Sequence, residues 1–438
     1  MHLPEFVSAC LSRLENVGFA CYAVGGCVRD WLMGNTPHDY DLCTAATPDQ
    51  IRQVFAGEKM VLAGEKHGTV GIITSGGVVE ITTFRTEGDY SDNRHPQWVK
   101  YVDDINGDLS RRDFSVNAMA WSPTRGLADP FGGQQDIKNK ILRAVGDPAT
   151  RFREDSLRIL RGVRFAVRFG LEPDEETMKA MKELAPLMDN LARERVFDEL
   201  CKLLPLVSAE DLKRFSPILA QILPELGATV GFDQRSPHHA YDIFTHTAHV
   251  TANVPADPSL RWAALLHDVG KVPAFTTDET GRGHFYGHAQ LSAEMADAIL
   301  RRLKAPTALR DQVVMLIDLH MTKFPPEKKA LRRWISRIGL ENLEKLLALQ
   351  QADTGSKGIR KDEELAHFVA LRQILDEILA ENACLRIQDL AINGHDLMAL
   401  GYHGPAIGKT LQALLDQVLD EQVENTRDSL LAALGTLN

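Results

Sequence analysis

Two short stretches near the N-terminus decide the fold of this chain: Val24-Gly25-Gly26-Cys27-Val28-Arg29-Asp30 and, nine residues after Asp30, Asp39-Tyr40-Asp41-Leu42. The apolar run Phe19–Val24 is typical of a strand, and the two glycines separate it from a helical segment ending near Gly34. Unhindered backbone N–H groups at a helix N-terminus can hold a triphosphate. The first stretch therefore predicts a strand, a phosphate-binding turn and a helix.

The second stretch carries paired carboxylates. In an extended segment over Asp39–Thr44, a period of two puts Asp39 and Asp41 on one face and Tyr40 on the other. Two carboxylates on one face repel each other, and a hard divalent cation such as Mg²⁺ relieves that repulsion. The pair therefore predicts a Mg²⁺ site, in which Glu80 is either a third ligand or an ordinary exposed strand residue.

The rest of the chain sets limits on the kind of protein. It has 438 residues, a formal net charge of −11 and six cysteines, none of them in a CxxC pair. No apolar run approaches the ~18 residues that span a bilayer, and the N-terminus lacks a signal-peptide pattern. We expect a soluble, cytoplasmic protein without a membrane partner, in which any nucleic-acid contact uses a local basic patch. Strand patterns continue at 69–75, 78–84 and 99–102, and helical patterns dominate from Asp147 onward.

Five further motifs follow in a fixed order and give the chain a family resemblance. They are Thr83-Phe84-Arg85-Thr86-Glu87 with Arg94-His95-Pro96, Arg111-Arg112-Asp113-Phe114-Ser115-Val116-Asn117-Ala118, Asp129-Pro130-Phe131-Gly132-Gly133, Arg153-Glu154-Asp155-Ser156-Leu157-Arg158 with Arg164-Phe165, and Glu194-Arg195-Val196-Phe197-Asp198-Glu199. With the two opening stretches, they resemble the tRNA nucleotidyltransferases of the bacterial and eukaryotic class, the CCA-adding enzymes of the DNA polymerase β superfamily.

This resemblance implies a fold and a division into domains. The fold class is α+β, with a polymerase-β-like nucleotidyltransferase head built on a mixed sheet and helical domains after it. The expected parts are the head (1–145), a helical neck that binds RNA (146–230), an HD domain as the body (231–360) and a helical tail (361–438).

The resemblance also implies an activity, which is template-independent addition of CCA to the 3′ end of tRNA from CTP and ATP. Asp39 and Asp41 would be catalytic Mg²⁺ ligands. The protein would bind tRNA, CTP and ATP as a monomer or homodimer. The expected nucleotide-binding residues are Gly25, Gly26, Arg29, Arg112, Asp113, Asn117, Asp155, Arg158, Arg161 and Arg164.

Asp155 and Arg158 can be interpreted through hydrogen-bond polarity. They lie in a helical pattern at a spacing that puts them on one helix face. Arginine only donates and aspartate only accepts, which suits the ring-nitrogen acceptor and amino donor of cytosine and adenine. Uracil and guanine would leave buried polar groups unpaired. A surface ion pair is the simpler alternative.

The same region is rich in arginine. Arg151, Arg153, Arg158, Arg161, Arg164 and Arg168 face only two acids within 151–168. Arginine binds phosphate in a bidentate way, so this pattern predicts a phosphate-binding stripe. The competing interpretation pairs these arginines with acids of the following helix.

Histidines concentrate in the predicted body. The pair His267-Asp268, with residues before and after it, resembles the HD metal-dependent phosphohydrolases, including the stretch Gly283-His284-Phe285-Tyr286-Gly287-His288. Imidazole and carboxylate ligands favour a transition metal such as Ni, Co, Mn or Fe over Mg. Whether this domain hydrolyses a phosphoester or only supports the fold stays open. The expected ligands are His246, His267, Asp268, His288, His320 and Asp353.

Other functions remain open at this stage. A bacterial poly(A) polymerase shares the head, but the neck stretch 161–170 resembles the CCA-adding form. An enzyme that adds only CC or only A is a second alternative, and the stretch Arg85–Pro96, which resembles a flexible loop associated with A addition, favours the full activity. The chain could also be mainly an HD hydrolase, or an RNA-binding module with a silent head, although Asp39, Asp41 and Asp113 are all present.

Overall fold

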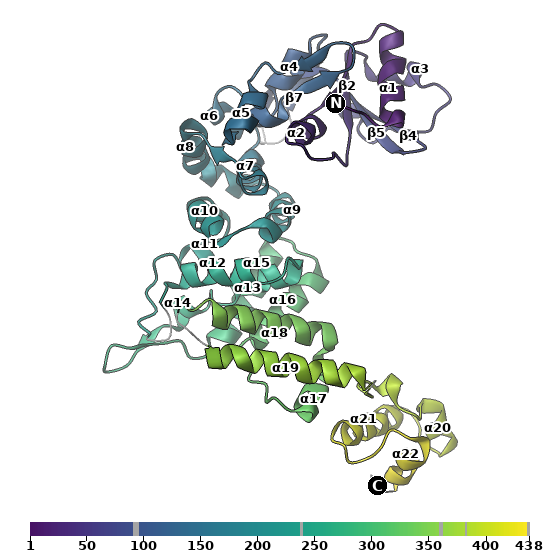
Figure 1. The fold of residues 1–438 in the computed structure, drawn as a ribbon, viewed down its shortest axis with the longest axis vertical. Helices are drawn as coiled ribbons and strands as arrows, with labels where there is room; N and C mark the ends of the chain where they lie inside the picture. The colour runs from purple at the N-terminus through teal and green to yellow at the C-terminus, as the bar shows by residue number, and fades with distance from the viewer. Residues whose placement is uncertain (91–95, 237–239, 359–361, 382, 436–438) are drawn as a thin grey trace. The chain divides into compact units, whose positions relative to one another are not determined.

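The fold is that of a computed structural model, which describes residues 1–90, 96–236, 240–358, 362–381 and 383–435 (Figure 1). The chain divides into two compact units. Unit 1 consists of Met1–Leu206 and Arg214–Pro224, and unit 2 consists of Val207–Lys213 and Glu225–Asn438. Among the described residues, no helix is both long enough and apolar enough to cross a bilayer.

A mixed seven-stranded sheet forms the first part of unit 1, in the order β3-β4-β5-β2-β1-β8-β9. β2 runs parallel to β5, and the other neighbouring pairs are antiparallel. Cys21 and Ala23 belong to one apolar cluster and Tyr22 and Val24 to another, so β1 is covered on both faces. The predicted α+β class with a mixed sheet is confirmed. The strands are β1 (Cys21–Val24), β2 (Asp41–Thr44), β3 (Met60–Val61), β4 (Thr69–Thr74), β5 (Gly77–Thr83), β8 (Ala120–Ser122) and β9 (Gly126–Ala128).

Helices cover both faces of this sheet. Leu11, Leu14 and Ile51 from two of them are fully buried in the cluster that contains Ala23. On the other face, Ile105 and Leu109 pack in the cluster that contains Val24. The helices are α1 (Glu5–Asn16), α2 (Gly26–Leu32), α3 (Pro48–Val54), α4 (Ile105–Ser110) and α5 (Gly133–Asn139).

A separate antiparallel hairpin occupies most of the stretch expected to be a flexible loop. β6 (Arg85–Tyr90) pairs with β7 (Pro96–Tyr101), so the described part of this stretch consists of two paired strands. Arg94 and His95 lie outside the described residues.

The remainder of unit 1 is mostly helical. Gly162 lets α7 lie against the head, because a Cβ there would come within 2.9 Å of the Phe114 ring. A two-residue parallel pairing joins β10 (Ile141–Leu142) to β11 (Glu172–Pro173). This pairing is too short to leave a periodic pattern, so the sequence did not predict it. The helices here are α6 (Pro148–Glu154), α7 (Leu157–Phe169), α8 (Glu175–Leu184), α9 (Arg193–Leu203) and α10 (Ala209–Ile222).

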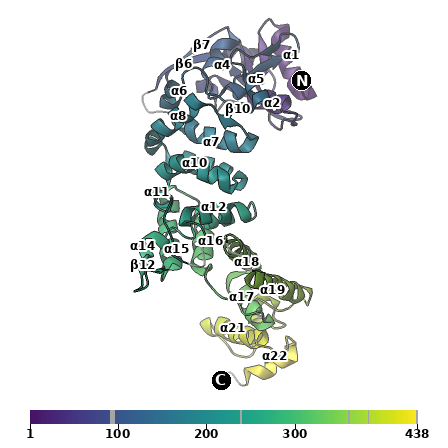
Figure 2. The same cartoon turned by 60° about the vertical axis from the view of Figure 1, so that its left-hand side comes forward.

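Unit 2 is helical apart from the short hairpin of β12 (Thr276–Thr277) and β13 (Gly283–His284). Figure 2 shows α18 and α19 packed side by side, and the last three helices enclose a core of their own around Leu397, Leu414 and Leu430. The helices are α11 (Pro224–Gly227), α12 (Ile243–Asn253), α13 (Pro258–Leu266), α14 (Lys271–Ala274), α15 (His288–Arg302), α16 (Thr307–Leu319), α17 (Lys328–Ile338), α18 (Leu340–Gly355), α19 (Asp362–Ala380), α20 (Gly394–Ala399), α21 (Pro405–Leu419) and α22 (Arg427–Leu434).

Candidate functional site

The predicted phosphate-binding turn lies between β1 and α2. Gly25 has a φ of +73° and its N–H donates to the carbonyl of Met119 at 3.0 Å. A Cβ at Gly25 would lie 2.9 Å from Nη1 of Arg112. Both the backbone conformation and the close approach require glycine. The turn therefore brings backbone and a guanidinium group together, which is a favourable arrangement for an anion.

The predicted carboxylate pair lies directly beside this turn. In the sheet, Asp41 is opposite Val24 on one side and opposite Glu80 on the other. Asp39 and Asp41 are exposed, whereas Tyr40 packs against the core and Leu42 is fully buried. The predicted alternation is thus present, although β2 begins only at Asp41, so Asp39 precedes the strand instead of belonging to it.

The surroundings of Asp41 fit a cation. Loss of water around Asp41 raises the pKa of its carboxyl group, and the negative charge of Glu80 raises it further, against the opposing charge of Arg112. These carboxylates offer the hard oxygen ligands that Mg²⁺ prefers. Within the described parts of the chain, however, their oxygens do not gather as a set of three within 4.8 Å of one another.

Four predicted nucleotide-binding residues form one polar network, in which three side chains are buried and that of Arg161 is partly exposed. Nη1 of Arg29 donates to Oδ1 of Asn117 at 2.5 Å, and Nδ2 of Asn117 donates to Oδ1 of Asp113 at 3.0 Å. Oδ2 of Asp113 accepts from Nε and Nη2 of Arg161 at 2.9 and 2.7 Å. The Arg161 partner holds the pKa of Asp113 at about 2, even though burial alone would raise it. Asp113 thus fixes the positions of two other side chains.

Asp155 and Arg158 do not share a helix face. α6 ends at Glu154, and Asp155 has an extended backbone between α6 and α7, so the predicted continuous helix is wrong here. Its carboxylate pairs with Arg195 at 2.8 Å and accepts from the N–H of Leu157 at 3.1 Å. The extended conformation of Asp155 lets its carboxylate reach the N–H of Leu157, the first residue of α7.

Arg158 is held separately from Asp155. Its Nη1 donates to Glu154 at 2.6 Å, and its Nη2 donates to the carbonyl of Arg111 at 2.9 Å. Asp155 therefore lies just before α7 and Arg158 lies in its first turn, and each is oriented by a different partner.

The predicted phosphate stripe of arginines is mostly paired with acids. Arg151 and Arg158 both contact Glu154, Arg161 contacts Asp113, and Arg164 contacts Glu199 at 2.6 Å. These ion pairs agree better with the interpretation that the arginines pair with acids, although only Glu199 lies on a later helix, α9. Glu154, the partner of Arg151 and Arg158, lies within the local window, whereas Asp113 and Glu199, the partners of Arg161 and Arg164, lie outside it.

Asp108 is a residue that the sequence analysis missed. Its side chain is fully buried and accepts from Arg111 at 2.8 Å and from Arg112 at 3.1 Å. The i, i+3 and i+4 spacing ahead of Arg111-Arg112 was the available signal. Asp108 thereby orients the guanidinium that lies over the Gly25 turn.

The Asp129-Pro130-Phe131-Gly132-Gly133 motif has a structural role in this fold. Asp129 accepts from the N–H groups of Gly133 and Gln134 at the start of α5 at 2.7 and 2.9 Å. Gly132 has a φ of +71°, and a Cβ at Gly133 would collide with the carbonyl of Ser115. The motif therefore fixes the entry to α5 against the segment that follows Asp113.

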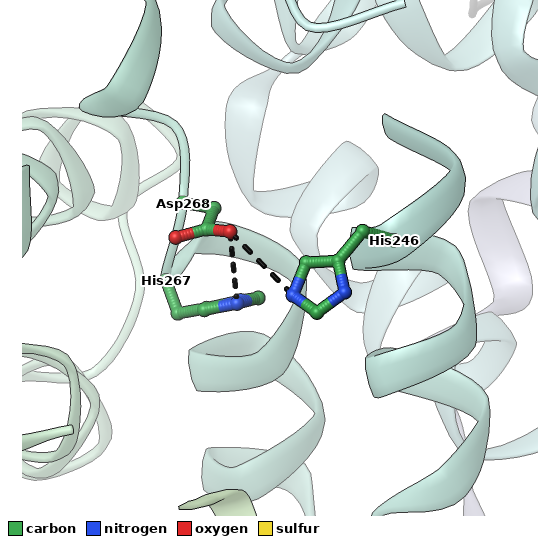
Figure 3. A group of neighbouring side chains, drawn as sticks. All are labelled: His246, His267 and Asp268. Atoms are coloured by element: carbon green, nitrogen blue, oxygen red, sulfur yellow. Dashed lines mark ion pairs between the residues drawn. The ribbon is translucent and has the colours of Figure 1, made fainter. Parts of the chain in front are cut away.

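In unit 2, the predicted histidines and aspartates lie close together, and Figure 3 shows three of them, His246, His267 and Asp268. His246 lies in α12, His267 directly follows α13, His288 begins α15, His320 follows α16, and Asp353 lies in α18. One set of possible ligand atoms contains His246, His267 and Asp268, and a second contains Asp268, His288 and His320. The two sets share Asp268.

The four imidazole rings are oriented in the same way. Each Nδ1 lies 2.6 to 3.1 Å from a backbone carbonyl oxygen. A carbonyl only accepts, so each Nδ1 carries a proton, and Nε2 is the ring nitrogen that faces the other groups of the centre. This second hydrogen bond is the arrangement that usually orients metal-binding histidines. The acceptors are the carbonyls of Ser356, Ala264, Phe285 and Ile317.

The Nε2 atoms surround Asp268. The distances to its carboxylate oxygens are 3.6 Å from His246, 3.3 Å from His267 and 3.6 Å from His288. Nε2 of His267 is buried and has no hydrogen-bond partner among the described residues. Burial lowers the pKa of His320 to about 4, so its ring is neutral near pH 7. Nε2 of His246 lies 2.9 Å from Oδ1 of Asp353 and Asp268 pairs with Lys271, so among the described residues it is the unpartnered Nε2 of His267, together with the nearby carboxylate oxygens, that fits a cation.

Comparison with known proteins adds independent information. Family models match residues 21–143 (Poly A polymerase head domain), 170–228 (Probable RNA and SrmB-binding site of polymerase A) and 275–434 (tRNA nucleotidyltransferase domain 2, putative). The CCA-adding enzyme of Streptococcus thermophilus is 31% identical over 98% of this chain and 97% of its own length. That of Geobacillus kaustophilus is 32% identical over 99% and 98%.

A solved structure agrees with these matches. The crystal structure of the Bacillus stearothermophilus CCA-adding enzyme in complex with CTP superposes with a TM-score of 0.73 at 28% identity, covering 100% of this chain and 98% of that one. Poly(A) polymerases share the head, so a match to the head alone would not distinguish the two kinds of enzyme. The relatives above match this chain over nearly its full length. The chain therefore belongs to the CCA-adding enzymes, a family of tRNA nucleotidyltransferases.

Proposed function

We propose that this chain adds C, C and A to the 3′ end of tRNA from CTP and ATP without a nucleic-acid template. The observation that carries this proposal is the sheet register that puts Asp41 between Val24 and Glu80. It brings the turn after β1 and the carboxylates of Asp41 and Glu80 together on neighbouring inner strands of the sheet. The match to a relative whose crystal structure contains CTP supports the choice of nucleotide.

Asp39 and Asp41 are the residues that would hold Mg²⁺, with Glu80 beside them. A bound divalent cation supplies charge neutralisation at the phosphates and activation of the attacking hydroxyl group. Arg112, oriented by Asp108, faces the turn at Gly25 and would contact the triphosphate. Asp113 and Asn117 are positioning residues that hold Arg161 and Arg29 toward the same region.

Asp155 and Arg158 would read the Watson–Crick edge of the incoming base. Arg195 holds the Asp155 carboxylate, and the carbonyl of Arg111 holds the Arg158 guanidinium. Because both side chains are fixed by partners, they can present one acceptor and one donor in a constant arrangement. Arg164, paired with Glu199, would support this helix instead of contacting phosphate.

The test is an addition assay with tRNA that ends at the discriminator base. The protein is incubated with each nucleoside triphosphate alone and with all four, and the 3′ ends are sequenced. We expect CCA from the mixture and no addition by Asp41→Ala, with Glu58→Gln as a charge-matched surface control. Long A tails would identify a poly(A) polymerase, and products ending after CC or lacking C addition would identify a partial enzyme.

A second activity is favoured by the histidine centre of unit 2. We propose that His246, His267, Asp268, His288, His320 and Asp353 bind transition-metal ions, with Asp268 shared by two ligand sets, in a phosphohydrolase site of the HD type. The uniform Nδ1 hydrogen bonds support this assignment. Bound metal supplies a water molecule of lowered pKa. The water oxygen would bond to phosphorus, the bond from phosphorus to the ribose oxygen would break, and that oxygen would take the proton.

A terminal or 2′,3′-cyclic phosphate on a tRNA end is the substrate we infer, because its removal frees the hydroxyl that the head extends. The experiment measures metal content and phosphate release after reconstitution with Ni²⁺, Co²⁺ or Mn²⁺. We expect both to be lost in His267→Ala while CCA addition continues. Absence of bound metal and of hydrolysis in the parent protein would refute this second activity.

A further inference from the structure

The face of the seven-stranded sheet that carries the carboxylates is covered over only part of its width. Val24 and Cys43, on the strands β1 and β2, are buried on this face in the apolar cluster that includes α4. Among the described residues, that cluster contains none from β3, β4 or β5. Asp41 and Glu80 therefore lie where the covered part of this face ends.

Three apolar side chains occupy the uncovered part of this face. Val61, Ile73 and Val78 are 43%, 41% and 53% exposed. Ile72 and Val79, next to two of them in the sequence, are buried in the core on the opposite face. Because side chains alternate along a strand, the exposed residues lie on the face of the carboxylates. We call Val61, Ile73 and Val78 the apolar strip.

The apolar strip is continuous with the carboxylates. In the sheet register, Gly71 lies opposite Glu80 on one side and opposite Val61 on the other. A Cβ at Gly71 would lie 3.1 Å from Cγ1 of Val78 and 3.2 Å from Cβ of Val61, so the two valines nearly meet above this glycine. Neighbouring strands are about 4.8 Å apart, so the strip begins about one strand spacing from Glu80.

A lysine lies at the outer end of the strip. Lys59 directly precedes β3, and its carbonyl accepts from the N–H of Ile73 at 2.9 Å. Its side chain is exposed and forms no ion pair with any residue that the structure describes. The strip is thus uncharged, with a positive charge at its outer end and the carboxylates of Asp41 and Glu80 at its inner end.

This distribution of charge matches the end of an RNA strand. The lysine attracts a backbone phosphate, while the uncharged strip can hold the parts of RNA that carry no charge, the riboses and the faces of the bases. Valine and isoleucine side chains have no hydrogen-bonding groups, so they do not distinguish one base from another. This tolerance suits an RNA whose last base changes with each addition. A second copy of the chain on this face would instead cover Asp41 and Glu80.

We propose that the apolar strip binds the single-stranded 3′-terminal nucleotides of the tRNA, with Lys59 near a backbone phosphate and the terminal hydroxyl group directed toward Asp41. The proposal rests on the proposed nucleotidyltransferase activity, for which it names the surface that holds the RNA end. Ile73 and Val78 are then RNA-binding residues that do not contact the incoming nucleotide.

The test uses the double variant Ile73→Thr/Val78→Thr of the full chain, because threonine keeps the β-branched shape that strands favour. Equilibrium binding is measured with two RNAs that share one acceptor duplex. The first has a single-stranded 3′ end that terminates in C-C, and the second is blunt. We expect the variant to bind the first RNA about fivefold more weakly than the parent protein does, and the blunt RNA equally well.

Steady-state addition of A to the first RNA gives a second readout. The KM for this RNA should rise by about fivefold in the double variant, whereas the KM for ATP should stay within about twofold of the parent value. Equal affinity of variant and parent for the first RNA would overturn the inference. An equal loss of affinity for both RNAs would also overturn it, because the strip would then contact the duplex.

Two further variants complete the test. Val17→Thr is the matched control, since Val17 is 57% exposed and follows α1, which packs on the opposite face; it should change neither affinity nor KM. Lys59→Gln should reduce the slope of log affinity against log salt concentration by about 0.7 for the first RNA, as expected for one lost phosphate contact to a single strand. An unchanged slope would contradict the place given to Lys59.

The proposed function and this inference can fail separately. If the parent protein adds no nucleotide but its affinity for the first RNA depends on Ile73 and Val78, the binding surface stands and the proposed function fails. If CCA is added and the double variant keeps the parental KM for RNA, the function stands and this inference fails. Sedimentation of the same samples addresses the other occupant: a parental dimer that dissociates in the double variant, with unchanged RNA affinity, would assign the strip to contact between copies and overturn the inference.

Discussion

Replacing Asp113 by Asn should destabilise unit 1 by about 2 kcal/mol at neutral pH. Burial alone would raise the pKa of Asp113, but the ion pair and hydrogen bonds with Arg161, together with Asn117, lower it from 3.8 to about 2. A shift of one unit corresponds to about 1.4 kcal/mol, so the ionised form is favoured in the folded state by about 2 kcal/mol. Asn117 and the N–H of Phe114 can still donate to an amide oxygen, so the main loss is the charge opposite Arg161.

The pH dependence of this loss has a definite sign. A carboxyl group whose pKa is lowered by folding stabilises the protein above its unfolded pKa, and it loses that contribution as the pH falls toward the folded value. The difference between parent and Asp113→Asn should therefore be constant from about pH 5 to 8 and shrink between about pH 4 and 2.

Urea unfolding of the full chain measures this effect, with hydrogen exchange of the α7 amides reporting on unit 1. The matched control is Glu58→Gln, which removes an acid from an ion pair whose two side chains are 42% and 46% exposed. Such a surface pair contributes at most about 1 kcal/mol. A difference below about 0.5 kcal/mol for Asp113→Asn throughout pH 5 to 8 would refute the reasoning, because pairing with Arg161 would then not stabilise the fold.

Three other predictions follow from the contacts of the two units. Arg195→Ala should reduce the discrimination of CTP against UTP by about tenfold in kcat/KM, because Arg195 fixes the Asp155 carboxylate. The affinity for tRNA should stay within about twofold of the parent value. Loss of tRNA affinity with intact nucleotide discrimination would contradict this role. Gly162→Ala should lower the free energy of unfolding by about 1 to 3 kcal/mol in urea titrations, because the added Cβ would press on the Phe114 ring. An unchanged midpoint of the urea transition would show that α7 can shift to make room for it. Ni²⁺ should raise the thermal midpoint of the parent protein but not that of His267→Ala, and equal shifts would exclude this site as the place where nickel binds.

Much of the head could be predicted from local pattern. The run before Gly25 formed β1, the alternation around Asp41 gave one exposed and one buried face, and the segments near 69–75 and 78–84 formed β4 and β5. These predictions held because the side-chain period of a strand is a property of the backbone, which neighbouring residues alone determine. In unit 2, the adjacent pair His267-Asp268 at the end of an apolar helical segment was the local pattern from which the resemblance to metal-binding HD proteins began.

The errors lie where a distant partner decides the structure. The sequence around Asp155 reads as one helix, but Arg195, forty residues later, holds its carboxylate at the break between α6 and α7. The ion pairs of Arg161 and Arg164 were also not predicted, because their partners Asp113 and Glu199 lie outside the local window. Which residues pair across a long sequence separation depends on tertiary packing, and the periodicity of a local segment does not predict it.

The sequence by itself determined which residue types could do the chemistry: glycines at a turn, carboxylates at a strand end, and histidines at the ends of helices. Only the tertiary structure decided their orientation. The Nδ1 atoms of four histidines face backbone carbonyls, and Asp108 directs Arg112 over Gly25. The physical reason is that a side chain's donor or acceptor type is fixed by its chemistry, whereas its direction depends on hydrogen bonds to groups that folding brings near.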